Sequence, residues 1–456
     1  MSHGFRITSA LWDKIHHFAS FPQTGVSLQQ MVLFGQNPSQ GTLLKASQFL
    51  SEELPVRLAH RVKELDELPH NLSNMPSIIK VKNWYAHSFE ELIKFPPLPA
   101  LSPDIRRSLF SSPPAANSNV GHQLPSSTPN PSLEHMLLVD DVANQNFPTS
   151  LDGSGSSGFN KLKLRVPMER RYYAAPLAST IEWPPEIREY NKRFTKMLEI
   201  IKTRHDPTVT TVAQGVLEWK QSQRARHIGL DMQQWLDRFY LSRIGIRFLI
   251  GQHIALNTQE SHSDYVGIIC TNANVHDIIE EAIENARFVC EEHYALFSSP
   301  PVQLICPKNL TFPYVPGHLS HIIFELLKNS LRAVVERHGV GSEGNFPPIK
   351  VIVVEGKEDI TIKISDEGGG IARSAMGYIW TYMYTTMKLG PGEGLNEDFR
   401  ATDFKAPMAG FGYGLPLSRL YARYFGGDLR LISMDGFGTD VYIHLNRLSS
   451  SREPLP

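Results

Sequence analysis

Hydrophobic and polar positions divide the chain into a helical part and a mixed part. Apolar residues recur at intervals of three and four over most of residues 11–95 and 184–297, which predicts amphipathic helices. Further along, β-branched runs alternate with helical patterns. The sequence therefore predicts an α+β fold, in which an all-helical bundle over residues 1–297 precedes an α/β sandwich over residues 298–450 and a short tail over residues 451–456.

The predicted bundle helices carry start and stop signals. Residues 27–35 begin with Ser and end with Gly. In residues 42–69 the pattern is helical, with Pro55 expected to break the helix and Pro69 to end it. Further helices are predicted over residues 77–95, 184–205, 208–220, 231–256 and 275–297.

Residues 96–184 interrupt the bundle and have a different composition. They are rich in Pro, Ser, Asn and Gly and have little periodic apolar content, which predicts a largely disordered insertion. Residues 161–173, KLKLRVPMERRYY, are basic and aromatic. They could form a docking segment, although a solvated loop is the simpler interpretation.

The C-terminal part centres on a helix predicted over residues 318–338. Its apolar face is broad, and His321, Glu325 and Asn329 recur every four residues, so they form one polar row. A carboxylate and an amide on such a helix are costly to bury without a partner. A metal-bound nucleotide would be one partner, and water on an exposed face would be another; the helix alone does not decide.

Three further motifs follow in order. SDEGGGI (residues 365–371) places Asp366 at the end of a predicted strand and glycines directly after it, where the backbone can approach a ligand. GFGYGLPLSR (residues 410–419) puts glycines before a helix, as in phosphate-binding turns. GTD (residues 438–440) offers the hydroxyl of Thr439.

Residues 372–409 separate the first two motifs, and their Gly-rich second half predicts a lid. Two strand pairs are also predicted here, over residues 349–368 and 428–446, with a helix over residues 417–427 between them.

Composition and charge narrow the possible functions. The 456 residues have a net charge of −1 and a pI near 7.0, which argues against nucleic acid as the main partner. The three cysteines are far apart and predict reduced thiols rather than disulfides or a zinc site. No uninterrupted apolar stretch is long enough for a transmembrane helix.

The order of motifs resembles the ATP-binding module shared by type II topoisomerases, heat-shock chaperone ATPases, mismatch-repair ATPases and histidine kinases. Four sequence segments give a more specific match: FELLKNSLRA, DEGGGI, AGFGYGLPLSRLYARYFGGDL and SMDGFGTDVYIHL. They resemble the mitochondrial protein kinases of pyruvate dehydrogenase and branched-chain ketoacid dehydrogenase. The predicted bundle also contains segments that resemble this family, namely SLQQMVLFG, AQGVLEWK and LDRFYLSRIGIRFLIGQH. Only about residues 96–184 have no counterpart in the family pattern.

The resemblance implies a role for each matching residue. Glu325 would be the general base for the target serine, His321 would tune it, and Asn329 would hold Mg²⁺. Asp366 would bind the adenine amino group. The other implied nucleotide-binding residues are Arg332, Gly368, Gly370, Thr385, Thr386, Gly410, Phe411, Gly412, Tyr413, Gly414, Leu415 and Thr439.

The resemblance also implies function, cofactors and partners. It implies a protein-serine kinase of the mitochondrial matrix that uses ATP with Mg²⁺, and K⁺ as an optional second ion. Its substrate would be the decarboxylase α subunit of a 2-oxoacid dehydrogenase complex, which phosphorylation inactivates. The lipoyl domain of the acyltransferase core would be its docking site, and the kinase would be a homodimer. The VAIK, HRD and DFG signatures of eukaryotic-type kinases are absent.

Alternatives remain open from the sequence. The chain ends in SSSREPLP without an Asp-Trp-containing tail, as branched-chain kinases do, whereas GFGYGLPLSR fits the pyruvate dehydrogenase kinases at least as well. Pyruvate dehydrogenase is the slightly preferred substrate. A histidine kinase using His253, and a catalytically silent scaffold, are the other two hypotheses.

Overall fold

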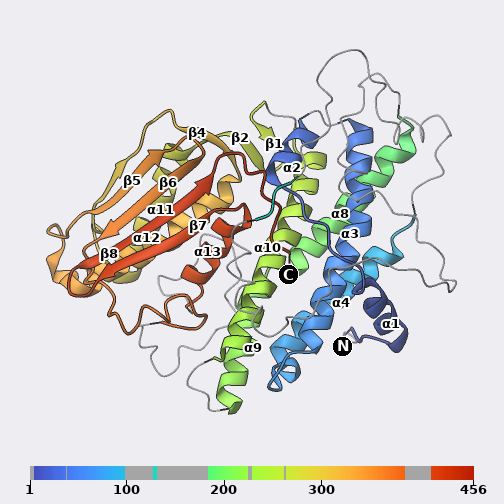
Figure 1. Cartoon of the computed structure of the whole chain (residues 1–456), viewed down its shortest axis with the longest axis horizontal. Coiled ribbons are helices and arrows are strands. Elements are labelled where there is room, and N and C mark those ends of the chain that lie inside the picture. Colours follow the sequence, from blue (N-terminus) through green and yellow to red (C-terminus); the bar gives the residue numbers. More distant parts are fainter. Residues whose placement is uncertain are drawn as a thin grey trace, which may run out of the picture.

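The computed structural model describes residues 5–36, 39–97, 127–130, 183–223, 228–260, 263–385 and 412–455. Figure 1 shows a bundle of long helices beside a sheet that helices cover. This arrangement confirms the predicted α+β fold class. The bundle consists of α1 (Ser9–Phe18), α2 (Leu28–Gly35), α3 (Gln40–Asp66), η1 (Leu72–Asn74), α4 (Pro76–Lys94), α8 (Pro185–Arg204), α9 (Thr208–Gln223) and α10 (Leu230–Thr258).

Helix α3 corrects one prediction, because it continues through Pro55 without a break. A proline inside a helix costs about 3 kcal/mol. The neighbouring Leu54 and Leu58 are fully or almost fully buried, and each contributes about 1.5–3 kcal/mol by burial. Packing of α3 inside the bundle therefore outweighs the missing hydrogen bond.

The main sheet has five strands in the order β3-β5-β6-β8-β7. Strands β3 and β5 are parallel, and the other neighbours are antiparallel, so both predicted strand pairs are confirmed. The strands are β3 (Val302–Ile305), β5 (Ile349–Glu355), β6 (Asp359–Asp366), β7 (Asp428–Met434) and β8 (Gly438–Asn446).

Three helices pack on one face of this sheet. They are α11 (Val275–Tyr294), α12 (Pro316–His338) and α13 (Gly414–Tyr424), and a short 3₁₀ turn, η2 (Val340–Ser342), follows α12. Alternate residues of β6, such as Ile360, Ile362 and Ile364, are fully buried under them. This alternation matches a sheet with one covered face.

A second sheet has three strands, in the order β1-β2-β4. Its strands are β1 (Tyr265–Val266), β2 (Ile269–Asn274) and β4 (Thr311–Tyr314). The domain boundary proposed near residue 298 stays a prediction. One hydrophobic core runs from the bundle into the sheet, and α11, which precedes residue 298, packs along α12.

The remaining sequence-based expectations concern thiols, membrane spans and the insertion. All three cysteines are free thiols. None of the helices in the described ranges is long and apolar enough to span a bilayer. Of the insertion, only residues 127–130 are within the described ranges at its centre, and the docking segment predicted over residues 161–173 lies outside them.

Candidate functional site

The polar row of α12 runs along one edge of that helix. His321 and Glu325 are half-buried, and Asn329 is exposed. The apolar face of α12, including Leu319 and Leu327, is fully buried in the core. The row therefore lies at the border between core and solvent, where its side chains can reach a ligand without being sealed in the protein.

Glu325 lies where α12 meets the start of α13. The ammonium group of Lys328, itself almost fully buried, is 2.9 Å from Glu325 Oε1. On the other side is Gly414, the first residue of α13: a Cβ added there would come within 2.6 Å of Glu325 Oε2. Glycine at this position leaves the backbone of the α13 N-terminus open beside the carboxylate.

His321 lies one turn before Glu325, with its ring centroid 5.0 Å from that of Tyr421 on α13. His318, one turn further back, is enclosed, and burial lowers the pKa of its imidazole to about 3. At the other end of the row, Arg332 Nε pairs with Glu336 Oε1 at 2.7 Å. The side-chain amide of Asn329 makes no hydrogen bond within the described residues, which leaves it available to a ligand.

Asp366 ends β6 as a buried carboxylate. Its Oδ2 accepts a hydrogen bond from Ser330 Oγ at 2.9 Å, and its Oδ1 accepts one from the backbone N–H of Gly368 at 2.9 Å. Burial raises the pKa of Asp366, and these hydrogen bonds partly offset the rise. Each carboxylate oxygen retains a second lone pair, so Asp366 can accept one more hydrogen bond from a ligand.

The glycines after Asp366 allow the backbone there to pack closely against α12 and against the end of β7. A Cβ on Gly368 would collide with Ala333 of α12. Gly370 has a φ of +72°, and a Cβ there would collide with the carbonyl oxygen of Met434. Thr439 is paired with Asp366 across β6 and β8, and its hydroxyl is 3.1 Å from Ser433 Oγ.

Replacing Gly370 with alanine is expected to lower the free energy of unfolding by about 2 kcal/mol or more, because the new methyl group meets a backbone carbonyl at a left-handed φ. Thermal unfolding of the purified protein measures the change. Gly377→Ala is the matched control, since a Cβ there has no heavy atom within 4 Å. Equal melting temperatures for the two variants would contradict this account.

The chain that precedes the predicted lid contacts the bundle, whereas the Gly-rich half of residues 372–409 lies outside the described residues. The backbone N–H of Tyr382 donates to Gln233 Oε1 at 2.8 Å, and the Tyr382 hydroxyl donates to Asp237 Oδ1 at 2.6 Å. Gly412, with a φ of +76°, would place a Cβ 2.7 Å from the backbone nitrogen of Tyr384. The described residues on either side of residues 386–411 therefore lie close together. Thr385 is the last described residue before this gap, and Thr386, Gly410 and Phe411 lie outside the described residues.

Gly412, Tyr413, Gly414 and Leu415 lie together at the start of α13, as predicted from the Gly-rich motif. Tyr413 is the N-cap residue, and no side chain caps the helix there. Backbone N–H groups at a helix start that no side chain caps can bind phosphate oxygens. This end of the site faces Glu325, whereas Asp366 and Thr439 form the opposite end.

Three residues of the site were missed by sequence reasoning. Lys328 could have been found from its i,i+3 spacing to Glu325. Ser330 is a small polar residue on a buried face of α12, but its partner Asp366 is 36 residues away. Ser433 accepts a hydrogen bond from the backbone N–H of Ile371 at 2.7 Å, a contact that only the folded sheet creates.

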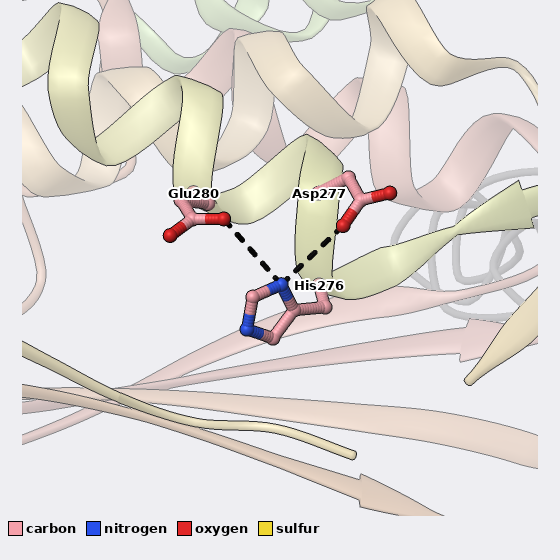
Figure 2. A group of neighbouring side chains, drawn as sticks. All are labelled: His276, Asp277 and Glu280. Atoms are coloured by element: carbon pink, nitrogen blue, oxygen red, sulfur yellow. Dashed lines mark ion pairs between the residues drawn. The ribbon is translucent and has the colours of Figure 1, made fainter. Parts of the chain in front are cut away.

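A separate cluster of possible metal ligands lies at the start of α11. His276 Nδ1 is 3.4 Å from Asp277 Oδ1 and 3.6 Å from Glu280 Oε2 (Figure 2). Carboxylates at a helix N-terminus are favoured by the helix dipole, which at the same time opposes a cation. We therefore assign this cluster to stabilisation of α11, and Asn329, with its hard amide oxygen, fits Mg²⁺ better.

Comparison with known proteins identifies the family. A family model described as mitochondrial branched-chain alpha-ketoacid dehydrogenase kinase matches residues 25–270. A second, described as histidine kinase-, DNA gyrase B-, and HSP90-like ATPase, matches residues 314–449.

Individual relatives match almost the whole chain. The mitochondrial [pyruvate dehydrogenase (acetyl-transferring)] kinase of Schizosaccharomyces pombe is 45% identical over 447 residues, 98% of each chain. The Arabidopsis thaliana kinase of the same name is 38% identical over 98% of this chain and 97% of its own. Isozyme 3 of Homo sapiens is 35% identical over 97% of this chain and 88% of its own. The chain therefore belongs to the family of mitochondrial protein kinases that contains the pyruvate dehydrogenase kinases and the branched-chain ketoacid dehydrogenase kinase.

Proposed function

We propose that this kinase uses Mg-ATP to phosphorylate a serine of the decarboxylase α subunit of pyruvate dehydrogenase and thereby inactivates it. The observation that carries the proposal is the continuous site along α12, which has a carboxylate beside an open helix start at one end and a buried carboxylate at the other. The relatives' names support pyruvate dehydrogenase as the substrate rather than the branched-chain complex.

The two ends of the site would bind different parts of the nucleotide. Asp366 would accept a hydrogen bond from the adenine amino group, with Gly368, Gly370 and Thr439 shaping the pocket. The backbone N–H groups of residues 412–415 would bind the phosphates. Asn329 would hold Mg²⁺, which neutralises phosphate charge when it is bound.

Glu325 would act on the serine hydroxyl. As the hydroxyl oxygen attacks the γ-phosphorus, the bond to the β–γ bridging oxygen breaks and ADP leaves. The hydroxyl proton passes to the carboxylate of Glu325 and then to water. His321, one turn away, would orient that carboxylate. Positioning and charge stabilisation account for most of catalysis in such transfers.

Incubation with Mg-ATP and each purified dehydrogenase complex tests the proposal. Phosphoserine on the α subunit of pyruvate dehydrogenase, with loss of its activity, is the expected result. Phosphorylation of the branched-chain complex alone would reverse the substrate assignment. Absence of phosphorylation on both, with intact ATP binding, would favour the scaffold hypothesis. Omitting K⁺ from parallel reactions tests its contribution.

A histidine kinase is disfavoured by the position of His253. This side chain is buried, and burial lowers the pKa of its imidazole to about 3. Its Nε2 lies 3.3 Å from Thr195 Oγ1 and 3.2 Å from the Asn257 amide nitrogen. An imidazole enclosed in this way cannot reach a phosphoryl donor, so we assign His253 a structural role.

We place the kinase in the mitochondrial matrix, docked on the lipoyl domain of the acyltransferase core. The relatives are named as mitochondrial kinases. Co-sedimentation with the isolated acyltransferase core, with and without lipoylation, tests the docking. Equal binding to both forms would contradict a lipoyl-dependent contact.

We also propose a homodimer formed through the outer face of the five-stranded sheet. On this face Ile305, Val354, Ile432 and Met434 expose more than half of their surface, although they lie on regular strands. These residues lie near both edges of the face, with the ion pair of Lys363 and Asp440 between them. Exposed apolar side chains on an uncovered sheet face indicate an interaction surface. A second copy would cover the same residues symmetrically.

The double variant Ile432→Asp, Met434→Asp is expected to shift the protein from dimer to monomer, because two carboxylates would be buried without partners. Sedimentation velocity measures the change. Val340→Asp, at an exposed apolar residue off the sheet, serves as the control. A wild-type protein that sediments as a monomer at micromolar concentration would contradict the dimer.

A further inference from the structure

Residues 451–455, which we call the tail segment, contribute to an ionic cluster buried far from the polar row of α12. Glu453 and Arg57 are 2% and 1% exposed. Arg57 donates to both carboxylate oxygens of Glu453, with Nη1 3.1 Å from Oε2, and its Nε donates to Glu53 Oε1 at 2.7 Å. One guanidinium thus faces two carboxylates. Burial by itself lowers the pKa of Arg57, but the two carboxylates raise it by more, so the net shift is upward.

Neutral donors add hydrogen bonds to both carboxylates, although Glu53 Oε2 accepts none within the described residues. The backbone N–H of Thr24 donates to Glu53 at 2.8 Å, and that of Val26 donates to Glu453 at 3.2 Å. The hydroxyl of Tyr424 donates to Glu453 Oε2. Buried charges are stable only when they are paired and hydrogen-bonded in this way, so the position of each partner is fixed.

Three helices meet at this cluster. Arg57 belongs to α3, and Tyr424 is the last residue of α13. On α10, a Cβ at Gly245 would lie 2.9 Å from Glu453 Oε2 and 3.0 Å from Arg57 Nη1. Glycine at this position allows α10 to pass directly beside the ions. The carboxylate of Glu453 therefore connects the bundle to α13.

The tail segment is held on both sides by extended chain. On one side the N–H of Glu453 donates to the carbonyl of Val26 at 3.1 Å. On the other lie residues 127–130 of the insertion, which we call the strap: the N–H of Arg452 donates to the carbonyl of Thr128 at 2.8 Å. The buried side chain of Asn130 donates to the carbonyls of Arg423 and Arg452, at 3.1 and 3.2 Å.

Helix α13 connects the ionic cluster to the candidate site. It runs from Gly414, beside Glu325, to Tyr424, in contact with Glu453. Its 11 residues span about 16 Å, so one continuous helix joins the two places. A change in the attachment of Tyr424 therefore changes where the N–H groups at the other end lie.

We propose that Glu453 is a positioning residue for the nucleotide: through Tyr424 it fixes α13 against the bundle, and the strap keeps it there. This inference rests on the nucleotide-binding part of the proposed function. It does not depend on which protein is phosphorylated.

Binding of MgATP to the full-length protein tests the proposal, measured by calorimetry below the melting temperature of every variant. Glu453→Gln keeps the shape of the side chain and removes its charge, and we expect its Kd for MgATP to rise about 10-fold. Asn130→Ala removes the hydrogen bonds from the strap to Arg423 and Arg452, and it should raise the Kd for MgATP about threefold. Glu284→Gln, a charge loss at an exposed position of α11, should leave it unchanged.

Hydrogen exchange separates positioning from a purely structural role. Coupling is reciprocal, so MgATP should slow exchange at the amides of Val26 and Glu453 in the wild type and much less in Glu453→Gln. A lower melting temperature with unchanged Kd and no effect of nucleotide on these amides would overturn the proposal. If Glu453→Gln does not fold, Asn130→Ala decides by the same two measurements.

The outcomes also separate this proposal from the proposed function. A wild-type protein that binds MgATP but phosphorylates neither dehydrogenase would refute the substrate assignment and leave the role of Glu453 intact. A wild-type protein that binds no MgATP would overturn both.

Discussion

Glu325→Gln is expected to lower the rate of phosphoryl transfer by about 10²–10⁴-fold while the Kd for MgATP changes little. Glutamine has nearly the same shape and can still accept a hydrogen bond from Lys328, but it cannot take a proton from the attacking hydroxyl. Single-turnover transfer to the dehydrogenase α subunit and equilibrium nucleotide binding, measured separately, give the two quantities.

The control for this prediction lies on the same helix. Glu336→Gln removes a carboxylate that pairs with Arg332 at the exposed end of α12, and it should retain most of the transfer rate. Loss of MgATP binding in Glu325→Gln would assign Glu325 a structural role beside Gly414 instead of a role as base.

Asp366→Ala is expected to raise the Kd for MgATP roughly 10–100-fold, because a hydrogen bond to a charged group contributes about 1.5–3 kcal/mol. The preference for ATP over GTP should shrink as well, since a carboxylate accepts from the amino group of adenine and is repelled by the carbonyl of guanine. Competition between the two nucleotides for the same site measures both effects.

Ser330→Ala provides the comparison. It removes the hydroxyl that donates to Asp366 at 2.9 Å but keeps the carboxylate, so the loss of affinity should be much smaller. A variant Asp366→Ala that binds ATP as tightly as the wild type, with an unchanged melting temperature, would exclude contact between this carboxylate and adenine.

Sequence patterns predicted the elements that carry their own periodicity. Helix α12 begins within two residues of its predicted start and ends where expected, because its apolar face repeats over six turns. The pairs β5–β6 and β7–β8 were predicted because each joins two β-branched runs through a short turn. The Gly-rich motifs also fell at the predicted ends of these elements.

Features that depend on distant partners could not be predicted in this way. Strand β1 has only two residues, β2 has the mixed sequence ICTNAN, and β2 pairs with β4, about 40 residues later. The polar row of α12 did not show whether it faced water or a ligand, because Gly414 and Asp366, which define its two ends, come from other elements. Pro55 was misjudged because its local cost is visible in the sequence, whereas the packing that compensates for it is not.

The contact between Arg57 and Glu453 joins residues 396 positions apart. Because synthesis proceeds from the N-terminus at about 5–20 residues per second, Arg57 is made roughly 20–80 s before its partner, counted over those 396 residues. During that interval Glu53, four residues before Arg57 on α3, can pair with the guanidinium group, but the contacts of Glu453 with Arg57 and Tyr424 cannot form. A translation product released before Glu453 would therefore lack the carboxylate that connects α3 to α13.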